Sequence, residues 1–350
     1  MNYREIVDYI EEIPKFTSKN PLDHTKALLK CLGDPQNQMQ VIHVAGTNGK
    51  GSVCAFLTSV FREAGLKVGT FISPHLIDFE ERIMVDGRQI SREDVTRIGN
   101  VLLEQEFGVT PTMFDYCVLM AVLYFKEQNC DLVIMETGLG GRLDSTNALG
   151  NPVVSVITRI GYDHMNILGN TIEEIAKVKA GIIKKGCPVV ALKQGDSVCE
   201  VIKNKAEECG SRCVLVEVPA SVEENVMTEQ GQRQGRCIQD RPIQKQCIQY
   251  PVQGTTLQDV HYGSVHTALG GVWQRENLSL ALAVLKLLEE SDYSITKEAV
   301  QSGIAKTIWH GRYEVLQTEP LFIIDGAHNP IAAKRLKQTI EKDFTNREII

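Results

Sequence analysis

Short apolar runs alternate with longer amphipathic stretches over the first 220 residues or so. Each run is a strand candidate, because four to eight consecutive apolar residues are typical of a strand buried on both faces. The order of strands and helices predicts a largely parallel sheet covered on both faces, and hence the α/β class. The runs lie at residues 40–45, 68–73, 131–136, 152–159 and 188–192.

The stretches between these runs predict helices. Ser91 is a candidate N-cap with acidic residues in the turn that follows, and the run 113–128 is apolar almost all round, which indicates a buried helix. Asp86-Gly87, within 82–90, predicts a hairpin turn. Further helices are expected at 49–64, 171–183, 276–289 and 296–305.

The pattern weakens after Pro219. The segment 223–258 is rich in Gln and is predicted to be an irregular or hairpin-like insertion without an assigned function. A new αβ unit begins near Trp309. A strand is expected at 321–325, a helix at 330–342 and the first residues of another strand at 347–350, so we expect an incomplete second domain.

Length, composition and charge exclude several classes of protein. A length of 350 residues allows about two domains. A net charge of −7 removes the electrostatic reason to propose nucleic-acid binding. No apolar run approaches the ~18 residues of a membrane span, and the first residues lack the order of a signal peptide. The ten Cys form no CxxC pair, so reduced thiols in the cytoplasm are expected.

A glycine-rich turn between a predicted strand and a predicted helix carries the strongest chemical signal. Its backbone N–H groups and the helix N-terminus favour an anion, Lys50 can neutralise phosphates, and Ser52 can offer a hydroxyl to Mg²⁺. The alternative is a structural turn with a chance lysine. By itself the loop predicts an ATP or GTP site, and it consists of Gly46, Thr47, Asn48, Gly49, Lys50, Gly51 and Ser52.

Four further candidates follow predicted strands, where open α/β sheets place their ligands. Ser73 and Glu136 end two strands, His164 follows a third, and Lys179 lies on the next helix. Mg²⁺ prefers oxygen ligands and tolerates an imidazole. Each residue alone has a structural explanation, as a cap, a loop histidine or a solvated lysine. Their combination with the phosphate loop favours a metal–nucleotide site.

At this point the motifs resemble the folylpolyglutamate synthase/dihydrofolate synthase branch of the Mur ligase superfamily. The resemblance extends from about residue 20 to 335, and the GLGGRLDSTN loop is similar to the folate branch rather than the cell-wall branch. The matching runs are HVAGTNGKGS at 43–52, SPHL at 73–76, ERI at 81–83, ETGLGGRLDSTN at 136–147, DH at 163–164, KAGI at 179–182, Gln274 with Asn277, GR at 311–312 and DGAHNP at 325–330.

The resemblance implies a large P-loop Mur-ligase-type ATPase domain with a mostly parallel sheet over residues 1–308. It also implies a truncated, smaller Rossmann-like α/β domain over 309–350. ATP would be bound by residues 46–52 with Asn277, Arg312 and Asp325. Two Mg²⁺ ions would be held by Ser52, Ser73, Glu136 and His164. Lys179 would carry a carbamate, and the residues expected to be catalytic are Lys50, Lys179, His164 and His328.

The implied reaction joins L-glutamate to the carboxylate of a folate or of dihydropteroate through an acyl phosphate. The resemblance implies a cytoplasmic monomer that binds neither nucleic acid nor membranes. Two segments, near residue 22 and at the GLGGRLDSTN loop, would approach the pterin-bearing substrate. The expected substrate-binding residues are Leu22, Asp23, Pro74, His75, Arg82, Gly140, Arg142, Asp144, Ser145 and Thr146.

Other classes stay open at this point. A nucleotide-binding regulator of the same fold would not need Lys179. A catalytically impaired fragment would release no phosphate, and exposed strand edges in an incomplete second domain predict weak activity. A peptidoglycan ligase of the Mur type is disfavoured by the folate-type loop. The choice between dihydropteroate and a reduced folate as acceptor also stays open.

Overall fold

The computed structural model describes residues 1–13, 22–218, 254–291 and 293–345. Its centre is an eight-stranded sheet in the order β4-β3-β2-β5-β1-β6-β7-β8. The six strands from β2 to β8 are parallel, and β3 and β4 add an antiparallel edge. The strands are β1 (Val41–Ala45), β2 (Val68–Phe71), β3 (Ile83–Val85), β4 (Arg88–Gln89), β5 (Leu132–Glu136), β6 (Val154–Ile157), β7 (Val189–Leu192) and β8 (Cys213–Val216).

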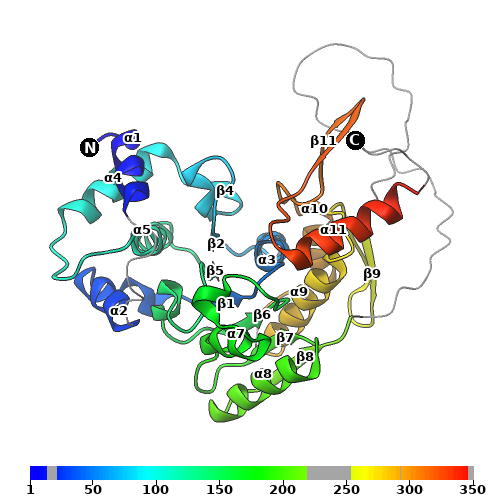
Figure 1. Ribbon diagram of the computed structural model, residues 1–350. Helices are drawn as coiled ribbons and strands as arrows, with labels where there is room; N and C mark the ends of the chain where they lie inside the picture. Colours follow the sequence, from blue (N-terminus) through cyan, green and yellow to red (C-terminus); the bar gives the residue numbers. More distant parts are fainter. Residues whose placement is uncertain (14–21, 219–253, 292, 346–350) are drawn as a thin grey trace.

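Helices cover both faces of this sheet (Figure 1). On one face α3, α9 and α10 pack with the side chains of Ile42 and Ile134. On the other, α1, α2, α4 and α5 pack with Val133, while α7 and α8 pack with Ile157. The helices are α1 (Tyr3–Glu12), α2 (Leu22–Cys31), α3 (Lys50–Glu63), α4 (Arg92–Glu104), α5 (Met113–Glu127), α6 (Met165–Leu168), α7 (Ile172–Lys179), α8 (Asp196–Glu208), α9 (Gln274–Glu289) and α10 (Lys297–Lys306).

Short 3₁₀ turns complete the main body: η1 (Pro35–Gln38), η2 (Phe79–Arg82), η3 (Ser145–Ala148) and η4 (Ala180–Ile182). The predicted central strands and the α/β class are confirmed. The hairpin at 82–90 forms as β3 and β4, and Ser91 caps α4 by accepting a hydrogen bond from the Asp94 N–H. The expected helix at 171–183 divides into α7 and η4, and α1, α2, α8 and β8 are additions to the prediction.

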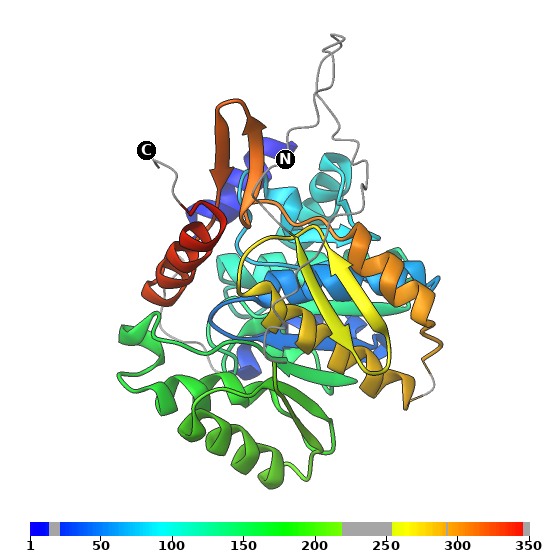
Figure 2. The same cartoon turned by 90° about the vertical axis from the view of Figure 1, so that its right-hand side faces the viewer.

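A second hairpin covers the outer surface of α9 and α10. It consists of β9 (Thr255–Asp259) and β10 (Gly263–Thr267), which pair antiparallel. Figure 2 shows it in yellow beside the two helices. The predicted insertion at 223–258 lies mostly outside the described residues. Its last residues belong to β9, which agrees with a hairpin and not with an irregular segment.

Residues 309–345 form a separate unit that extends from the body (Figures 1 and 2). We call this unit the C-terminal wall. It contains the antiparallel strands β11 (Glu314–Thr318) and β12 (Leu321–Ile324), followed by α11 (Pro330–Asp343). The expected strand at 321–325 and helix at 330–342 are present. The expected strand at 347–350 lies outside the described residues, and a domain boundary at 308 stays a prediction.

The described residues contain no disulfide among the eight cysteines that they include. None of the described helices is long and apolar enough to cross a membrane. The carboxyl ends of β2, β5, β1 and β6 meet at one edge of the sheet, since Val44 pairs with Glu136 and Ala45 with Ile157. The C-terminal wall stands beside that edge.

Candidate active site

The loop between β1 and α3 is tied to the end of β6. The Thr47 and Asn48 N–H groups donate to the Arg159 carbonyl oxygen at 2.8 and 3.2 Å. Thr47 Oγ1 accepts a hydrogen bond from the Gly161 N–H at 3.0 Å. Residues 46–52 all line a pocket at the carboxyl edge of the sheet. The N-terminus of the 14-residue helix α3 therefore opens into this pocket, where it favours an anion.

Two glycines of this loop are required by close neighbours. Gly49 has a φ of 92°, in the left-handed region, and a Cβ there would lie 2.1 Å from Asn277 Oδ1. A Cβ on Gly51 would lie 2.7 Å from Trp309 Cζ2. The unusual glycine between Lys50 and Ser52 thus makes room for an indole ring from the C-terminal wall.

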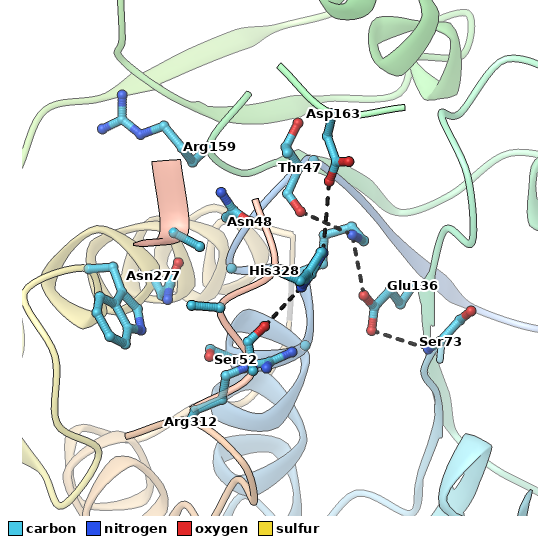
Figure 3. A pocket seen from close by; sticks show the side chains of 18 of the residues that line it. Thr47, Asn48, Ser52, Ser73, Glu136, Arg159, Asp163, Asn277, Arg312 and His328 are labelled. Atoms are coloured by element: carbon cyan, nitrogen blue, oxygen red, sulfur yellow. Dashed lines mark hydrogen bonds and ion pairs between the residues drawn. The ribbon is translucent and has the colours of Figure 1, made fainter. Parts of the chain in front are cut away.

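A buried carboxylate faces the lysine of the loop. Lys50 Nζ lies 3.6 Å from Glu136 Oε1, and the Ser73 N–H donates to Glu136 Oε2 at 3.4 Å. Figure 3 shows Glu136 and Ser73 together on one side of the pocket. Glu136 is only 5% exposed. Burial raises the pKa of Glu136, while the positive charge of Lys50 opposes that shift.

A second lysine lies beneath the loop. Lys179, at the end of α7, is 4% exposed, and its Nζ donates to the Gly46 carbonyl oxygen at 2.7 Å. Burial, with a smaller effect of the Lys50 charge, lowers the pKa of Lys179 to about 7. The Lys179 amine is therefore neutral in a large fraction of molecules near pH 7, whereas an ordinary lysine is almost fully protonated there.

The C-terminal wall closes the pocket with polar contacts. Asn48 and Asn329 exchange two side-chain hydrogen bonds, at 3.2 and 2.9 Å. The Asn329 amide also donates to Asp163 Oδ2 at 3.2 Å, and His328 Nε2 lies 3.8 Å from the same oxygen. Asp325 accepts a hydrogen bond from the Tyr313 N–H, which orients its carboxylate at the end of β12.

All of the residues predicted to bind nucleotide or metal or to be catalytic line this one pocket. Two of the predicted substrate-binding residues, Pro74 and Gly140, line it as well. Their individual roles stay predictions. The predicted residues that line this pocket are Gly46, Thr47, Asn48, Gly49, Lys50, Gly51, Ser52, Ser73, Pro74, Glu136, Gly140, His164, Lys179, Asn277, Arg312, Asp325 and His328.

Several predicted substrate residues lie behind the pocket. Arg82 is buried, where its Nε donates to His75 Nδ1 at 2.9 Å and its Nη1 lies 3.5 Å from Ser73 Oγ. Asp144 is also buried and accepts hydrogen bonds from Thr146 and from the Leu139 N–H. These side chains hold the loops that border the pocket, so they do not face it in this structure.

The remaining predicted substrate residues lie farther along the same two segments. Leu22 and Asp23 begin α2, and Ser145 begins η3. Ser145 Oγ and Thr25 Oγ1 both donate to Asp115 Oδ1, at 2.7 and 2.9 Å. One carboxylate on α5 therefore joins the segment near residue 22 to the GLGGRLDSTN loop, whose Arg142 is exposed.

The donor set fits a magnesium ion that takes most of its ligands from phosphate and water. The residues that the structure describes hold no cluster of three or more His, Cys, Asp or Glu. At the sheet-edge side of the pocket they offer the Glu136 carboxylate and the hydroxyls of Ser52 and Ser73. Such a sparse set of hard oxygen donors suits Mg²⁺ on a triphosphate better than it suits zinc.

Sequence reasoning missed an ionic group at the far end of this pocket. Arg159, Glu276 and Arg335 also line it, and both guanidinium groups bind the Glu276 carboxylate. Asp163 and Trp273 complete this part of the lining. The DGAHNP run, which continues into α11, could have pointed to Asn329. Asp163 lies in the DH pair at 163–164, whereas no local signal marks Arg159, Glu276 or Arg335, because they come from separate segments.

The fold and the pocket define a nucleotide-binding protein with the Mur ligase fold. A model of the Mur ligase middle domain matches residues 44–285. The chain is 38% identical to the dihydrofolate synthase/folylpolyglutamate synthase of Bacillus subtilis (strain 168), over 99% of the chain and 78% of that relative. It is 33% identical to the folylpolyglutamate synthase of Lacticaseibacillus casei, again over 99% of the chain and 78% of the relative.

A solved structure of an FPGS–AMPPCP–folate complex superimposes with a TM-score of 0.84. It is 32% identical and covers 99% of this chain and 82% of its own. The chain therefore belongs to the folylpolyglutamate synthase/dihydrofolate synthase family of the Mur ligases. The earlier identification by motifs is confirmed.

Proposed function

We propose that this protein is an ATP-dependent ligase that joins L-glutamate to a folate or to dihydropteroate. The observation that carries the proposal is the arrangement of Lys50, Glu136 and Lys179 around the loop at 46–52, with the C-terminal wall beside it. The family membership supports the same reaction, since the relatives from Bacillus subtilis and Lacticaseibacillus casei are named for it. A binding module would need no buried carboxylate and neutral amine beside the phosphates.

The reaction has two steps. The acceptor carboxylate attacks the γ-phosphorus of ATP, the bond to the β-phosphate oxygen breaks, and ADP leaves. The α-amine of L-glutamate then attacks the acyl carbon, the carbon–oxygen bond to phosphate breaks, and the amine loses a proton as the amide forms. The first step needs positive charge in the pocket, because the acceptor carboxylate and the triphosphate are both anions and repel each other as they approach.

The residues of this chain bind and orient the triphosphate. The N-terminus of α3 and Lys50 neutralise the phosphates, and Arg312 adds a third positive group from the C-terminal wall. Mg²⁺ ions, held by Glu136, Ser52 and Ser73 with His164, would polarise the γ-phosphate. His328 and Asp325 lie on the wall, where closure would exclude the water that hydrolyses an acyl phosphate.

Lys179 is proposed to carry a carbamate. A neutral amine is the form that reacts with CO₂, and burial supplies it near pH 7. The carbamate is an anion. It would replace the repulsion between Lys179 and Lys50 by an attraction to Lys50 and to the metal ions. A monomeric state and a cytoplasmic location stay predictions.

The proposal is tested by ADP release in the presence of L-glutamate, with dihydropteroate and tetrahydrofolate compared as acceptors. Release that requires both glutamate and one of these acceptors supports the ligase, and the ratio of the two rates identifies the acceptor. ADP release that is independent of any pterin, or none at all, would favour the nucleotide-binding regulator or the impaired fragment.

A further inference from the structure

The far end of the pocket contains an ionic group whose three members come from three segments. Arg159 Nε donates to Glu276 Oε2 at 3.1 Å, and its Nη2 contacts Oε1. Arg335 Nη1 donates to Oε2 at 2.7 Å and its Nη2 to Oε1 at 2.5 Å. We call Arg159, Glu276 and Arg335 the arginine clamp. It joins the end of β6, the first turn of α9 and the middle of α11.

The clamp is a defined and partly buried structure. The side chains of both arginines are 23% exposed and that of Glu276 is 13% exposed. Burial alone would raise the pKa of Glu276, but the two guanidinium groups hold it below its usual value. Glu276 is therefore ionised at neutral pH. Two cations on one anion leave a local positive charge in the pocket wall, which suits a polyanionic ligand.

The position of the clamp assigns it to one end of the nucleotide. Glu136 and Ser73 lie on one side of the loop, and Arg159 and Asn277 lie on the other (Figure 3). If the γ-phosphate lies against Lys50 and Glu136, the α-phosphate and the sugar extend toward the clamp. Each guanidinium keeps further N–H donors beyond those that bind Glu276, and both groups line the pocket.

The clamp also acts on the phosphate loop through the backbone. The carbonyl oxygen of Arg159 accepts the hydrogen bonds of the Thr47 and Asn48 N–H groups. Asn329, six residues before Arg335, pairs with the Asn48 side chain. The same carboxylate that holds α11 therefore holds the residue that orients the loop.

We propose that Arg159 and Arg335 are further nucleotide-binding residues and that Glu276 is the positioning residue that sets them against the sugar and α-phosphate of ATP. This inference rests on the proposed function for the direction of the triphosphate. It adds a specificity element for the nucleoside end that the loop at 46–52 does not supply.

The test measures nucleotide binding directly, without turnover. The non-hydrolysable analogue AMPPCP and inorganic tripolyphosphate, which lacks a nucleoside, are titrated with Mg²⁺ into the full chain. Calorimetry gives the Kd, and the fluorescence of the chain's two tryptophans, Trp273 and Trp309, gives a second signal near the pocket. The variants are Glu276→Gln, Arg335→Ala and Arg335→Lys, each checked by its thermal unfolding midpoint.

Glu276→Gln and Arg335→Ala are expected to raise the Kd of AMPPCP about tenfold, the effect of one lost charge-assisted interaction. Arg335→Lys should lose affinity as well, because lysine keeps the charge but not the planar fork. Tripolyphosphate affinity should fall by a smaller factor, because its third phosphate still reaches the arginines but it carries no sugar for them to bind. The kcat at saturating ATP and the KM of the acceptor should stay near the parent values, which a general structural defect would not allow.

Two control variants match these substitutions outside the pocket. Glu127→Gln removes a carboxylate on α5 that binds Arg97 on α4 with bonds of 2.6 and 3.0 Å. Lys337→Ala removes an exposed cation from α11 itself. Neither should change the Kd of AMPPCP.

An unchanged AMPPCP Kd in the three clamp variants would overturn the inference, and so would an equal loss for AMPPCP and tripolyphosphate. Failure of the proposed function looks different. In that case the parent chain binds AMPPCP, the clamp variants weaken it, and no glutamate is joined to any pterin.

Discussion

The two sides of the nucleotide pocket are built in opposite ways. The sheet-edge side consists of Lys50, Ser73, Glu136 and Lys179, of which Glu136 and Lys179 are buried and have pKa values shifted by that burial. The C-terminal wall presents groups such as His328, whose side chain is 65% exposed, and several of its contacts to the body are polar. Rigid, desolvated groups suit the chemical step, whereas exposed ones suit binding and release of the nucleotide.

This contrast assigns different kinetic effects to the two sides. Substitutions at the sheet edge should lower kcat, because they remove charge next to the reacting phosphate. Substitutions in the wall should raise the KM for ATP and leave kcat closer to its parent value. The predictions below test that division, from the largest expected effect to the smallest.

Glu136→Gln is expected to lower kcat by about a thousandfold or more, because it removes the buried carboxylate that faces Lys50 and that is proposed to hold Mg²⁺ together with the Ser52 and Ser73 hydroxyls. Since burial raises the pKa of Glu136, its charged form is disfavoured in the fold, and the isosteric amide should not lower the Tm. ADP release and thermal unfolding measure the two effects. A kcat within tenfold of the parent would remove Glu136 from the reacting centre.

Lys179→Ala is expected to lower kcat at least about tenfold, since it removes the group proposed to become a carbamate. In the parent chain, activity should rise as the pH increases through about 7, because the neutral amine accumulates above its pKa. Depleting CO₂ should lower the activity, and added bicarbonate should restore it. Full activity in Lys179→Ala would instead favour a nucleotide-binding regulator.

The same lysine predicts a pH dependence of stability. Its folded pKa of about 7 lies below the ordinary value of 10.5, so the unfolded chain binds more protons between those two values. The contribution of Lys179 to the free energy of unfolding should therefore rise with pH from about 7 to 10.5. Urea unfolding at pH 7 and pH 9 measures it, and the rise should be smaller in Lys179→Met.

Gly51→Ala tests the contact between the two sides. The new Cβ would meet the indole of Trp309 at 2.7 Å, so the wall must shift away from the loop. We expect the KM for ATP to rise roughly tenfold, as for the loss of one or two good contacts. Combining it with Trp309→Ala should restore part of the loss. Equal KM values for Gly51→Ala and the parent would show that the wall does not press on the loop.

Asn329 should show the smallest effect of the four sites. Asn329→Ala removes the amide pair with Asn48 and the N-cap of α11, which accepts from the Ala332 N–H. The expected rise in the KM for ATP is about three- to fivefold, with a loss of ~1 kcal/mol in stability. Asn329→Asp keeps the cap but sets a second carboxylate beside Asp163, so its Tm should recover while its KM rises further.

The sequence predicts one side of the pocket better than the other, for a physical reason. The runs at 40–45 and 131–136 are mostly apolar because β1 and β5 are buried on both faces. The polar residues at the ends of these strands therefore stand out in the sequence. The loop at 46–52 is contiguous and carries its own signature. Ser73 and Glu136 are therefore predicted from strand ends and Lys50 from the motif, whereas Lys179 is predicted from its place on the helix that follows.

The arginine clamp could not be found in that way. Arg159 and Glu276 are 117 residues apart, and Glu276 and Arg335 are 59 apart. Their meeting depends on how α9 and α11 pack, which no local pattern encodes. The wall itself is predicted from the strand run at 321–325 and the helical stretch at 330–342, whereas β11, with a largely exposed pattern, gives no strand signal.

The most direct test of the account follows the oxygen atoms of the acceptor. The acceptor is prepared with ¹⁸O in its reacting carboxylate, and the phosphate released during glutamate addition is examined by mass spectrometry. Transfer of the γ-phosphoryl group to that carboxylate predicts one ¹⁸O atom in each phosphate released. Phosphate without label, at a normal rate of amide formation, would contradict activation of the carboxylate in this pocket.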